Sequence, residues 1–311
     1  MSDRPEELAG VETVDCTGQQ VLVTGSTSGI GRATALALGR LGADVVVHGR
    51  DPEAGAEVVD ELAGLGVDAE FLAADFASVE EVERLATAVR AETDGLDLLV
   101  NNAGGLFRDA AVTDLGVEYT FHVNHLSPYL LTVELLDHLA PDARVVTTAS
   151  AAHTGASLSL DRVQEEDLLS GLAAYSHSKL ANVLFATELA RRLDATGSTV
   201  TSNSLHPGAI PGSGFARFLP GPLPSLVQQL SVVPGVSSVA DGAAEILHVG
   251  VSPQTAEASG GYFSGQRPRA PSTAAQDSTA ASRLWTVSAD LLGIDEPLST
   301  TGDGVTAQST E

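Results

Sequence analysis

Two side chains in the segment 173–192, AYSHSKLANVLFATELARRL, have the types and the spacing to move a proton. Tyr175 is a phenol, and Lys179 is the only lysine in a chain that carries 41 acidic residues. Residues four apart lie on one face of a helix, so the ammonium would lie beside the phenol. A neighbouring cation favours the phenolate and lowers the pKa of a tyrosine from its usual value of about 10. The pair therefore predicts a general acid/base. The compact ammonium can stabilise the phenolate, whereas the larger, planar arginine fork would fill that space differently.

Ser150 is placed to hold the oxygen on which such a proton transfer acts. It follows the apolar run 143–149, which predicts a strand, and open α/β sheets bind ligands at the carboxyl ends of strands. Hydride transfer to a carbonyl puts negative charge on its oxygen, which a serine hydroxyl can hold while Tyr175 protonates it. Taken singly, each of these residues has a plain structural explanation. Together they predict the interconversion of a carbonyl and an alcohol.

A glycine-rich loop, TGSTSGIG at 24–31, follows one predicted strand and begins a helix. Its glycines allow a tight turn and bring backbone N–H groups close to a pyrophosphate, while the helix N-terminus adds partial positive charge. A tight turn without a ligand can have the same pattern. The place of this loop on the first strand of the first βαβ unit nevertheless favours a dinucleotide site.

The remaining pattern alternates between strands and helices, which predicts parallel pairing in a single doubly wound, Rossmann-type α/β domain over 1–311. The predicted strands are 20–24, 43–48, 68–74, 96–101, 143–149 and 199–206. The predicted helices are 30–41, 52–65, 78–93, 117–139 and 173–195.

Two segments depart from this alternation. The stretch 207–236 mixes proline and glycine with apolar residues, so it predicts an ordered flap over a cleft rather than a polar linker. Three flap residues are candidates either for a substrate wall or for plain loop anchors: Phe215, Phe218 and Leu219. The polar end of the chain, 297–311, is predicted to fray.

Composition limits the partners and the compartment. The formal net charge is −25, so nucleic acid and anionic membranes would repel the chain. The acids of 51–94 are expected on solvated helix faces, and the scarcity of lysine beside many acids is typical of halophile proteins, an ordinary acidic protein being the alternative. The sequence shows no signal peptide and no apolar run long enough to span a membrane, and its single cysteine, Cys16, forms no intrachain disulfide. These features predict a cytoplasmic protein.

Other chemistry-bearing residues are interpreted as structural. His153 and His177 lie near the candidate site in sequence, and His206 is expected to pack at a strand end. No spacing of His, Cys or carboxylates suggests a metal site. Trp285 lies in a helical pattern that predicts a C-terminal helix docked on the sheet.

The order of these motifs resembles the short-chain dehydrogenase/reductase family over nearly the whole chain. The segments that carry the resemblance are TGSTSGIG, AADF with Asp75, NNAG at 101–104, FHVNHLSPYLL with Asn124, VVTTASAAH with Ser150, YSHSK from Tyr175 to Lys179, and HPG at 206–208. Four further segments resemble the retinol-dehydrogenase-like branch of the family: VNHLSPYLLT, AYSHSKLANVLFATELARRL, GGYFSG and SRLWTVSADLLGI.

The resemblance implies residue roles. Asn124 would complete the catalytic set with Ser150, Tyr175 and Lys179 by bonding a water beside the lysine. The implied cofactor-binding residues are Gly25, Ser26, Ser28, Gly29, Ile30, Gly31, Asp75, Phe76, Asn102, Ala103, Gly104, Tyr175, Lys179, Pro207, Gly208 and Ile210. The family's threonine after the last of these glycines is missing, and Ser213 is the candidate to replace its contact with the nicotinamide. Family members often pair through two long helices, here 117–139 and 173–195, which implies a homodimer or homotetramer.

Cofactor choice is decided after the second predicted strand, in ADVVVHGRD. An NAD-preferring protein would carry an acid at the position of Gly49, where it would accept from the ribose 2′-OH. Arg50 carries a fixed charge that can fork onto a 2′-phosphate, and Arg32 adds to the positive field. The pattern typical of NADP binding is incomplete. Arg50 can instead pair with a neighbouring acid, and Ser28 stands where many NADP-preferring members of the family have a basic residue. The sequence predicts NADP(H) in preference to NAD(H).

Three functions are consistent with these residues. The first is an NADP(H)-dependent alcohol dehydrogenase or carbonyl reductase for a small apolar molecule. The second is a reductase of a carbon–carbon double bond that uses the same Tyr175 and Lys179. The third is a dinucleotide-binding regulator without turnover, which the presence of both residues disfavours.

Overall fold

The structure, a computed structural model, describes residues 4–107, 111–164, 169, 171–208 and 237–299. Its strands form one eight-stranded sheet in the order β3-β2-β1-β4-β5-β6-β7-β8, in which only the last pair is antiparallel. The strands are β1 (Gln20–Val23), β2 (Asp44–Gly49), β3 (Ala69–Ala73), β4 (Leu96–Asn101), β5 (Leu139–Thr148), β6 (Thr201–His206), β7 (Tyr262–Ser264) and β8 (Pro268–Arg269).

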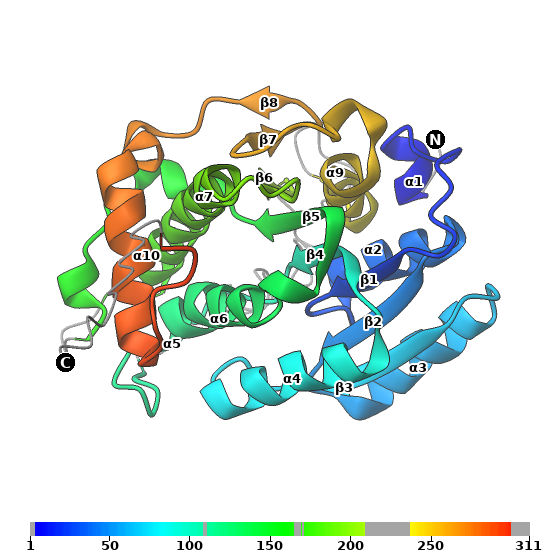
Figure 1. Ribbon diagram of the computed structural model, residues 1–311, viewed down its shortest axis with the longest axis horizontal. Helices are drawn as coiled ribbons and strands as arrows, with labels where there is room; N and C mark the ends of the chain where they lie inside the picture. The colour runs from blue at the N-terminus through cyan, green and yellow to red at the C-terminus, as the bar shows by residue number, and fades with distance from the viewer. Residues whose placement is uncertain (1–3, 108–110, 165–168, 170, 209–236, 300–311) are drawn as a thin grey trace, which may run out of the picture.

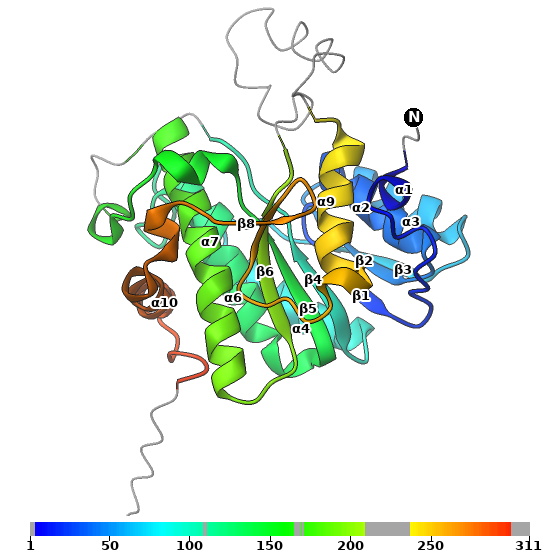
Figure 2. The same ribbon diagram turned by 90° about the horizontal axis from the view of Figure 1, so that it is seen from above.

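Helices cover both faces of this sheet (Figures 1 and 2). One face packs against α2, α3, α9 and the short α1, and the other against α4, α6 and α7, with α10 outside α7. The helices are α1 (Pro5–Leu8), α2 (Gly29–Arg40), α3 (Pro52–Ala63), α4 (Val79–Glu92), α5 (Tyr119–Phe121), α6 (Ser127–Glu134), α7 (Leu172–Ala195), α9 (Val239–Val251) and α10 (Ser278–Leu292). The prediction of one doubly wound α/β domain is confirmed.

The continuous apolar runs of the central strands follow from this double cover. In β1, Val21 and Val23 join the core on one face of the sheet, and Leu22 joins the core on the other. A strand that is buried on both faces has no polar alternation, which is typical of parallel sheets. These apolar runs are the reason that the central strands could be predicted from the sequence.

The single helix predicted over 117–139 is wrong in its middle and at its end. The α-helical turn α5 gives way to a π-helical turn at His122–Leu126 before α6 begins at Ser127. Pro128 has no N–H to donate four residues back to Asn124, so the helical ladder changes at this point. The chain then enters β5 at Leu139, four residues before the predicted strand, where Leu139 pairs with Leu96 ahead of a register irregularity.

The prediction that the C-terminal helix docks on the sheet is wrong. α10 docks on other helices. Trp285 of α10 stacks on Phe185 of α7, with ring centroids 5.9 Å apart, and lies edge-on to Tyr129 of α6 at 5.0 Å. α10 therefore covers part of the two helices through which pairing was expected. A homodimer or homotetramer remains a prediction and would have to use a surface that α10 leaves open.

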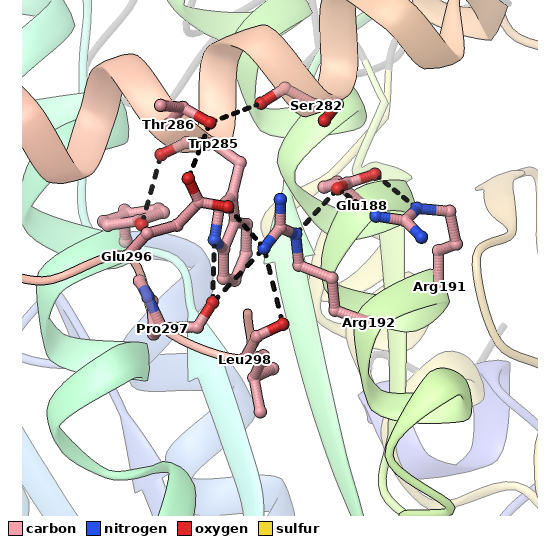
Figure 3. A network of polar contacts seen from close by, with 10 residues as sticks. Glu188, Arg191, Arg192, Ser282, Trp285, Thr286, Glu296, Pro297 and Leu298 are labelled. Carbon is pink, nitrogen blue, oxygen red and sulfur yellow. Dashed lines mark hydrogen bonds and ion pairs between the residues drawn. The ribbon is translucent and has the colours of Figure 1, made fainter. Parts of the chain in front are cut away.

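A buried ion network fastens the chain after α10 to the end of α7 (Figure 3). Arg192 donates to Glu188 at 2.7 Å and pairs with Glu296, also at 2.7 Å. Arg192 and the Trp285 indole also donate to the Pro297 carbonyl. The predicted fraying from residue 297 is thus wrong at its first residues, because these contacts hold them.

The acids of 51–94 lie largely on exposed faces of α3 and α4, as expected, for example Glu53, Glu57, Glu80 and Glu83. Their repulsion should weaken as the Debye length falls from about 10 Å in 0.1 M salt to about 3 Å in 1 M salt. We therefore expect the Tm to rise by several degrees between low and molar KCl, measured by thermal unfolding. A flat or falling Tm would contradict the halophile interpretation.

Candidate active site

The predicted site residues converge on the edge of the sheet where its parallel strands end. The glycine loop follows β1, Asn102 follows β4, Ser150 follows β5 and Pro207 follows β6. Strand order reverses between β1 and β4, and dinucleotides bind at such switch points of doubly wound sheets. The sequence motifs are therefore brought together by topology.

Two glycines of the loop are required by close backbone contacts. A Cβ on Gly31 would lie 2.2 Å from the Gly25 carbonyl oxygen, and a Cβ on Gly25 would lie 2.9 Å from the Cα of Ala103. The first backbone bond of α2 runs from Arg32 N–H to the Ser28 carbonyl, so the N–H groups of 29–31 precede the helical ladder. This tight turn, with three amides outside the helical ladder, fits a pyrophosphate.

Thr24 and Asn102 brace this loop. The Thr24 hydroxyl donates to the Val100 carbonyl at 3.1 Å and accepts from the N–H groups of Asn102 and Ala103 at 2.9 and 3.0 Å. The Asn102 amide donates to the Thr24 carbonyl at 2.9 Å. The side chain of Asn102 thus holds the loop, and the cofactor contacts of Asn102, Ala103 and Gly104 stay predictions.

Ser26 and Ser28 differ in what their hydroxyls can do. Ser26 is fully buried, donates to the Val23 carbonyl at 2.6 Å and accepts from the His48 N–H at 2.9 Å. Its side chain is committed to the fold, so only its backbone can face a cofactor. Ser28 is exposed, and its hydroxyl does not cap α2. The Ser28 hydroxyl is therefore not used to cap the helix, and it lies beside the amides of Gly29 and Ile30.

His48 is a site residue that the sequence analysis missed. Its Nδ1 accepts from the Gly25 N–H at 3.1 Å, and its Nε2 bonds the Ala74 carbonyl at 3.2 Å. Burial lowers the pKa of His48 to about 4, so the ring is neutral and donates from Nε2. The histidine ties the glycine loop to the residue before Asp75. Its place in a strand gave no sign of this contact.

Arg50 and Asp75 lie at the predicted adenine end of the site. Their side chains are 65% and 41% exposed and lie 3.8 Å apart, so the arginine does pair with an acid, although not a neighbour in sequence. Gly49 lies under Thr27, because a Cβ at Gly49 would come within 2.5 Å of the Thr27 methyl. Phe76 stacks on a histidine ring in the core, so its side chain does not face a cofactor.

Ser150 and Tyr175, the predicted reacting pair, lie in contact. Tyr175 sits in the first turn of α7 and its phenol hydrogen-bonds with the Ser150 side chain. Burial raises the pKa of Tyr175, and the bond to Ser150 only partly offsets this. The expectation that the neighbouring cation sets this pKa is therefore not met, since burial dominates. The phenol is held in its proton-donating form.

Lys179 lies one turn along α7 and is only 4% exposed. Its Nζ is 5.7 Å from the centre of the Tyr175 ring and donates to the Thr148 carbonyl at 2.9 Å. Burial lowers the pKa of Lys179 to about 8. The lysine is thus cationic at neutral pH and anchored to the end of β5, two residues before Ser150.

Asn124 reaches the same region from the π-helical turn. Its Oδ1 accepts from the Gly105 N–H at 2.8 Å, and its Nδ2 donates to the Gly105 carbonyl and to Ser178 Oγ, both at 2.9 Å. A Cβ on Gly104 would lie 2.6 Å from that Oδ1 and 3.7 Å from Lys179 Nζ. Asn124 therefore fixes the loop after β4 beside the lysine. Its role toward a water stays a prediction.

The histidines interpreted as structural do make structural contacts. His177 Nε2 accepts from the Ser159 N–H at 3.0 Å. His153 is more informative, because its Nδ1 bonds the Ser150 carbonyl at 2.7 Å and its Nε2 accepts from the Ser272 N–H. His153 thus steadies Ser150, the predicted catalytic serine, through a contact that no sequence pattern marks.

Other predicted site residues are only partly placed. Pro207 and Gly208 follow β6, and Gly208 has a φ of 97°, which favours glycine. The predicted flap contacts lie outside the described residues: Ile210, Ser213, Phe215, Phe218 and Leu219. In the described part of the chain, no cluster of three or more His, Cys, Asp or Glu side chains could hold a metal ion. Within the same ranges, no helix has the length and apolar character to cross a membrane.

Comparison with known proteins agrees with this geometry. Residues 19–218 match the family described as short chain dehydrogenase. Human retinol dehydrogenase 13 is 36% identical over 297 residues, which span 90% of this chain and 86% of that protein. The retinol-dehydrogenase-like resemblance is therefore confirmed.

Two solved structures have the same fold and contain NADP. A short-chain dehydrogenase from Burkholderia cenocepacia J2315 in complex with NADP is 27% identical, with a TM-score of 0.65 over 79% of this chain and 96% of that chain. Landomycin C-6 ketoreductase LanV with bound NADP and rabelomycin is 27% identical, with a TM-score of 0.60 over 80% of this chain and 95% of that chain.

Proposed function

Because this chain belongs to the short-chain dehydrogenase family, a family of oxidoreductases, we propose that it transfers hydride between NADP(H) and the carbonyl carbon of a small apolar substrate. The reaction interconverts an alcohol and an aldehyde or ketone. The observation that carries the proposal is the half-buried contact between Ser150 and Tyr175, with the buried Lys179 one helical turn away, at the sheet edge that holds the glycine loop.

The residues divide the work of carbonyl reduction. Bound NADPH supplies the hydride. The Ser150 hydroxyl holds the substrate oxygen as negative charge develops on it, and Tyr175 donates its phenolic proton to that oxygen. Lys179 then faces the phenolate with a positive charge and shifts from the Thr148 carbonyl toward the cofactor ribose. Asn124 keeps the loop after β4 in place beside this lysine.

NADP(H) is the proposed cofactor in preference to NAD(H). Gly49 offers no carboxylate to a ribose 2′-OH, and the exposed Arg50 lies next to it at the end of β2. The presence of NADP in the two solved structures supports this choice. The acid paired with Arg50 is also exposed, so the guanidinium can turn to a 2′-phosphate at small cost.

Replacing Arg50 with alanine is expected to lower kcat/KM for NADPH by about tenfold while changing that for NADH little, because only the phosphate needs the cation. Steady-state rates with both cofactors check this. Arg84→Ala is the matched control, since Arg84 is an arginine of similar exposure, 66%, on the surface of α4. A wild type that prefers NADH, or an NADPH preference that survives Arg50→Ala, would remove Arg50 from this role.

Substrate class and product separate the competing functions. The retinol dehydrogenase and ketoreductase names of the similar proteins support alcohols, aldehydes and ketones of apolar compounds as the first panel. Product identification after incubation with NADPH and α,β-unsaturated carbonyl compounds distinguishes reduction of the carbonyl from reduction of the double bond. Binding of NADPH without turnover of any compound would favour the regulator. A cytoplasmic location and the absence of nucleic-acid or membrane partners remain predictions from charge and composition.

A further inference from the structure

The Thr148 carbonyl at the end of β5 accepts two buried donors from α7. Lys179 Nζ lies 2.9 Å from this oxygen, and Asn182 Nδ2 lies 3.2 Å from it. Lys179 is 4% exposed and Asn182 is 2% exposed, so neither donor has water as an alternative partner. The catalytic lysine therefore shares its anchor with an asparagine three residues along the helix, a residue to which the proposed mechanism gives no task.

The other half of the Asn182 amide faces His125 of the π-helical turn without bonding it. Asn182 Oδ1 and His125 Nδ1 are buried, and neither makes a hydrogen bond with a described residue. His125 Nε2 lies 3.0 Å from Ser288 Oγ, which donates to the Leu284 carbonyl at 2.8 Å, so the ring is fixed from α10 rather than by Asn182. The hydrogen bond that Asn182 makes is therefore the one to the Thr148 carbonyl.

We propose that Asn182 is a positioning residue for Lys179, because it keeps the Thr148 carbonyl bonded when the ammonium moves to the cofactor. This rests on the proposed function, in which Lys179 leaves that carbonyl to face the ribose and the tyrosinate. A buried carbonyl without a donor is costly. With Asn182 present, the lysine moves without leaving one behind. Without Asn182, the carbonyl holds the ammonium back.

The alternative is that Asn182 merely fills the core. The two roles differ in what they change. A packing residue affects the stability of the folded chain, whereas a positioning residue affects cofactor affinity and the titration of Tyr175. Burial already raises the pKa of Tyr175, so an ammonium held at Thr148 would leave that pKa higher still.

The test uses the full chain and Asn182→Leu, which keeps the volume and removes the amide. We expect the Kd for NADPH, measured by direct titration, to weaken about tenfold. We also expect the pH profile of alcohol oxidation to move toward alkaline pH, because this direction needs the phenolate. Asn182→Ser keeps a short donor and should recover part of both effects.

Asn203→Leu is the matched control. Asn203 is a buried amide on β6 that donates to the Ala258 carbonyl and accepts from the Gly261 N–H, away from Lys179. The Asn203→Leu variant should lower the Tm without moving the pH profile of alcohol oxidation. Unchanged NADPH affinity and pH profile in Asn182→Leu, or equal shifts in Asn203→Leu, would overturn the positioning role. Failure of the proposed function itself would appear separately, as a wild type that binds no NADPH or reduces no carbonyl.

Discussion

Replacing Tyr175 with phenylalanine is expected to lower kcat for carbonyl reduction by about 10²–10⁴, because the phenylalanine ring has no proton to give to the substrate oxygen. The ring keeps its place in the first turn of α7, so the fold and the cofactor cleft should persist. NADPH affinity should change little. The loss therefore falls on kcat rather than on cofactor binding, which stopped-flow reduction and NADPH titration measure separately.

A second tyrosine controls for the loss of a buried hydroxyl. Tyr129 is fully buried and its hydroxyl donates to the Trp285 carbonyl at 3.2 Å, outside the site. Tyr129→Phe should cost stability and leave kcat close to wild type. Near-normal turnover in Tyr175→Phe would mean that another group supplies the proton.

The pH profile of the wild type follows from the same residue. Burial raises the pKa of Tyr175, so the phenol stays protonated through neutral pH. Reduction needs that proton and should weaken only as pH rises through the raised pKa, while oxidation should strengthen over the same range.

Lys179→Arg is expected to damage both turnover and cofactor affinity although it keeps the charge. Lys179 is 4% exposed, and Gly104 lies beside its ammonium, since a Cβ at Gly104 would lie 3.7 Å from Nζ. Overpacking a buried site costs about 1–3 kcal/mol, and the planar fork points its donors elsewhere. We expect kcat/KM for NADPH to fall by about a hundredfold, a loss near the upper end of that range.

The measurement is steady-state kinetics together with direct NADPH binding. Lys179→Met, which removes the charge and keeps the length, separates size from charge. If Lys179→Arg retains near-normal kinetics, the charge alone suffices and the argument from ammonium geometry is wrong.

Much of this site could be predicted because its residues lie in short local patterns. The glycine loop, the Tyr175–Lys179 spacing and the strand before Ser150 each depend on neighbours in the chain, and topology alone brings them together. The contact of His48 with Gly25 joins residues 23 positions apart, and no local pattern marks it.

The pKa of Tyr175 could not be predicted for a related reason. Spacing shows that a cation lies one turn away, but it does not show how deeply the phenol is buried or that the ammonium is bonded to Thr148. The break in the helix after Phe121 is similar: Pro128 is visible in the sequence, but the apolar pattern around it continues and conceals the π-helical turn.

The account depends most directly on hydride transfer from NADPH to a carbonyl carbon with Tyr175 as proton donor. The decisive measurement is to incubate the protein with NADPH deuterated at the transferable position and a panel of apolar aldehydes and ketones, and to locate the label by mass spectrometry and NMR. We expect one deuterium on the carbinol carbon of the alcohol product with wild type, and a loss of about 10²–10⁴ in its rate with Tyr175→Phe. Label on the β-carbon of an α,β-unsaturated member of the panel with the carbonyl intact, or no labelled product while NADPH binds, would contradict the account.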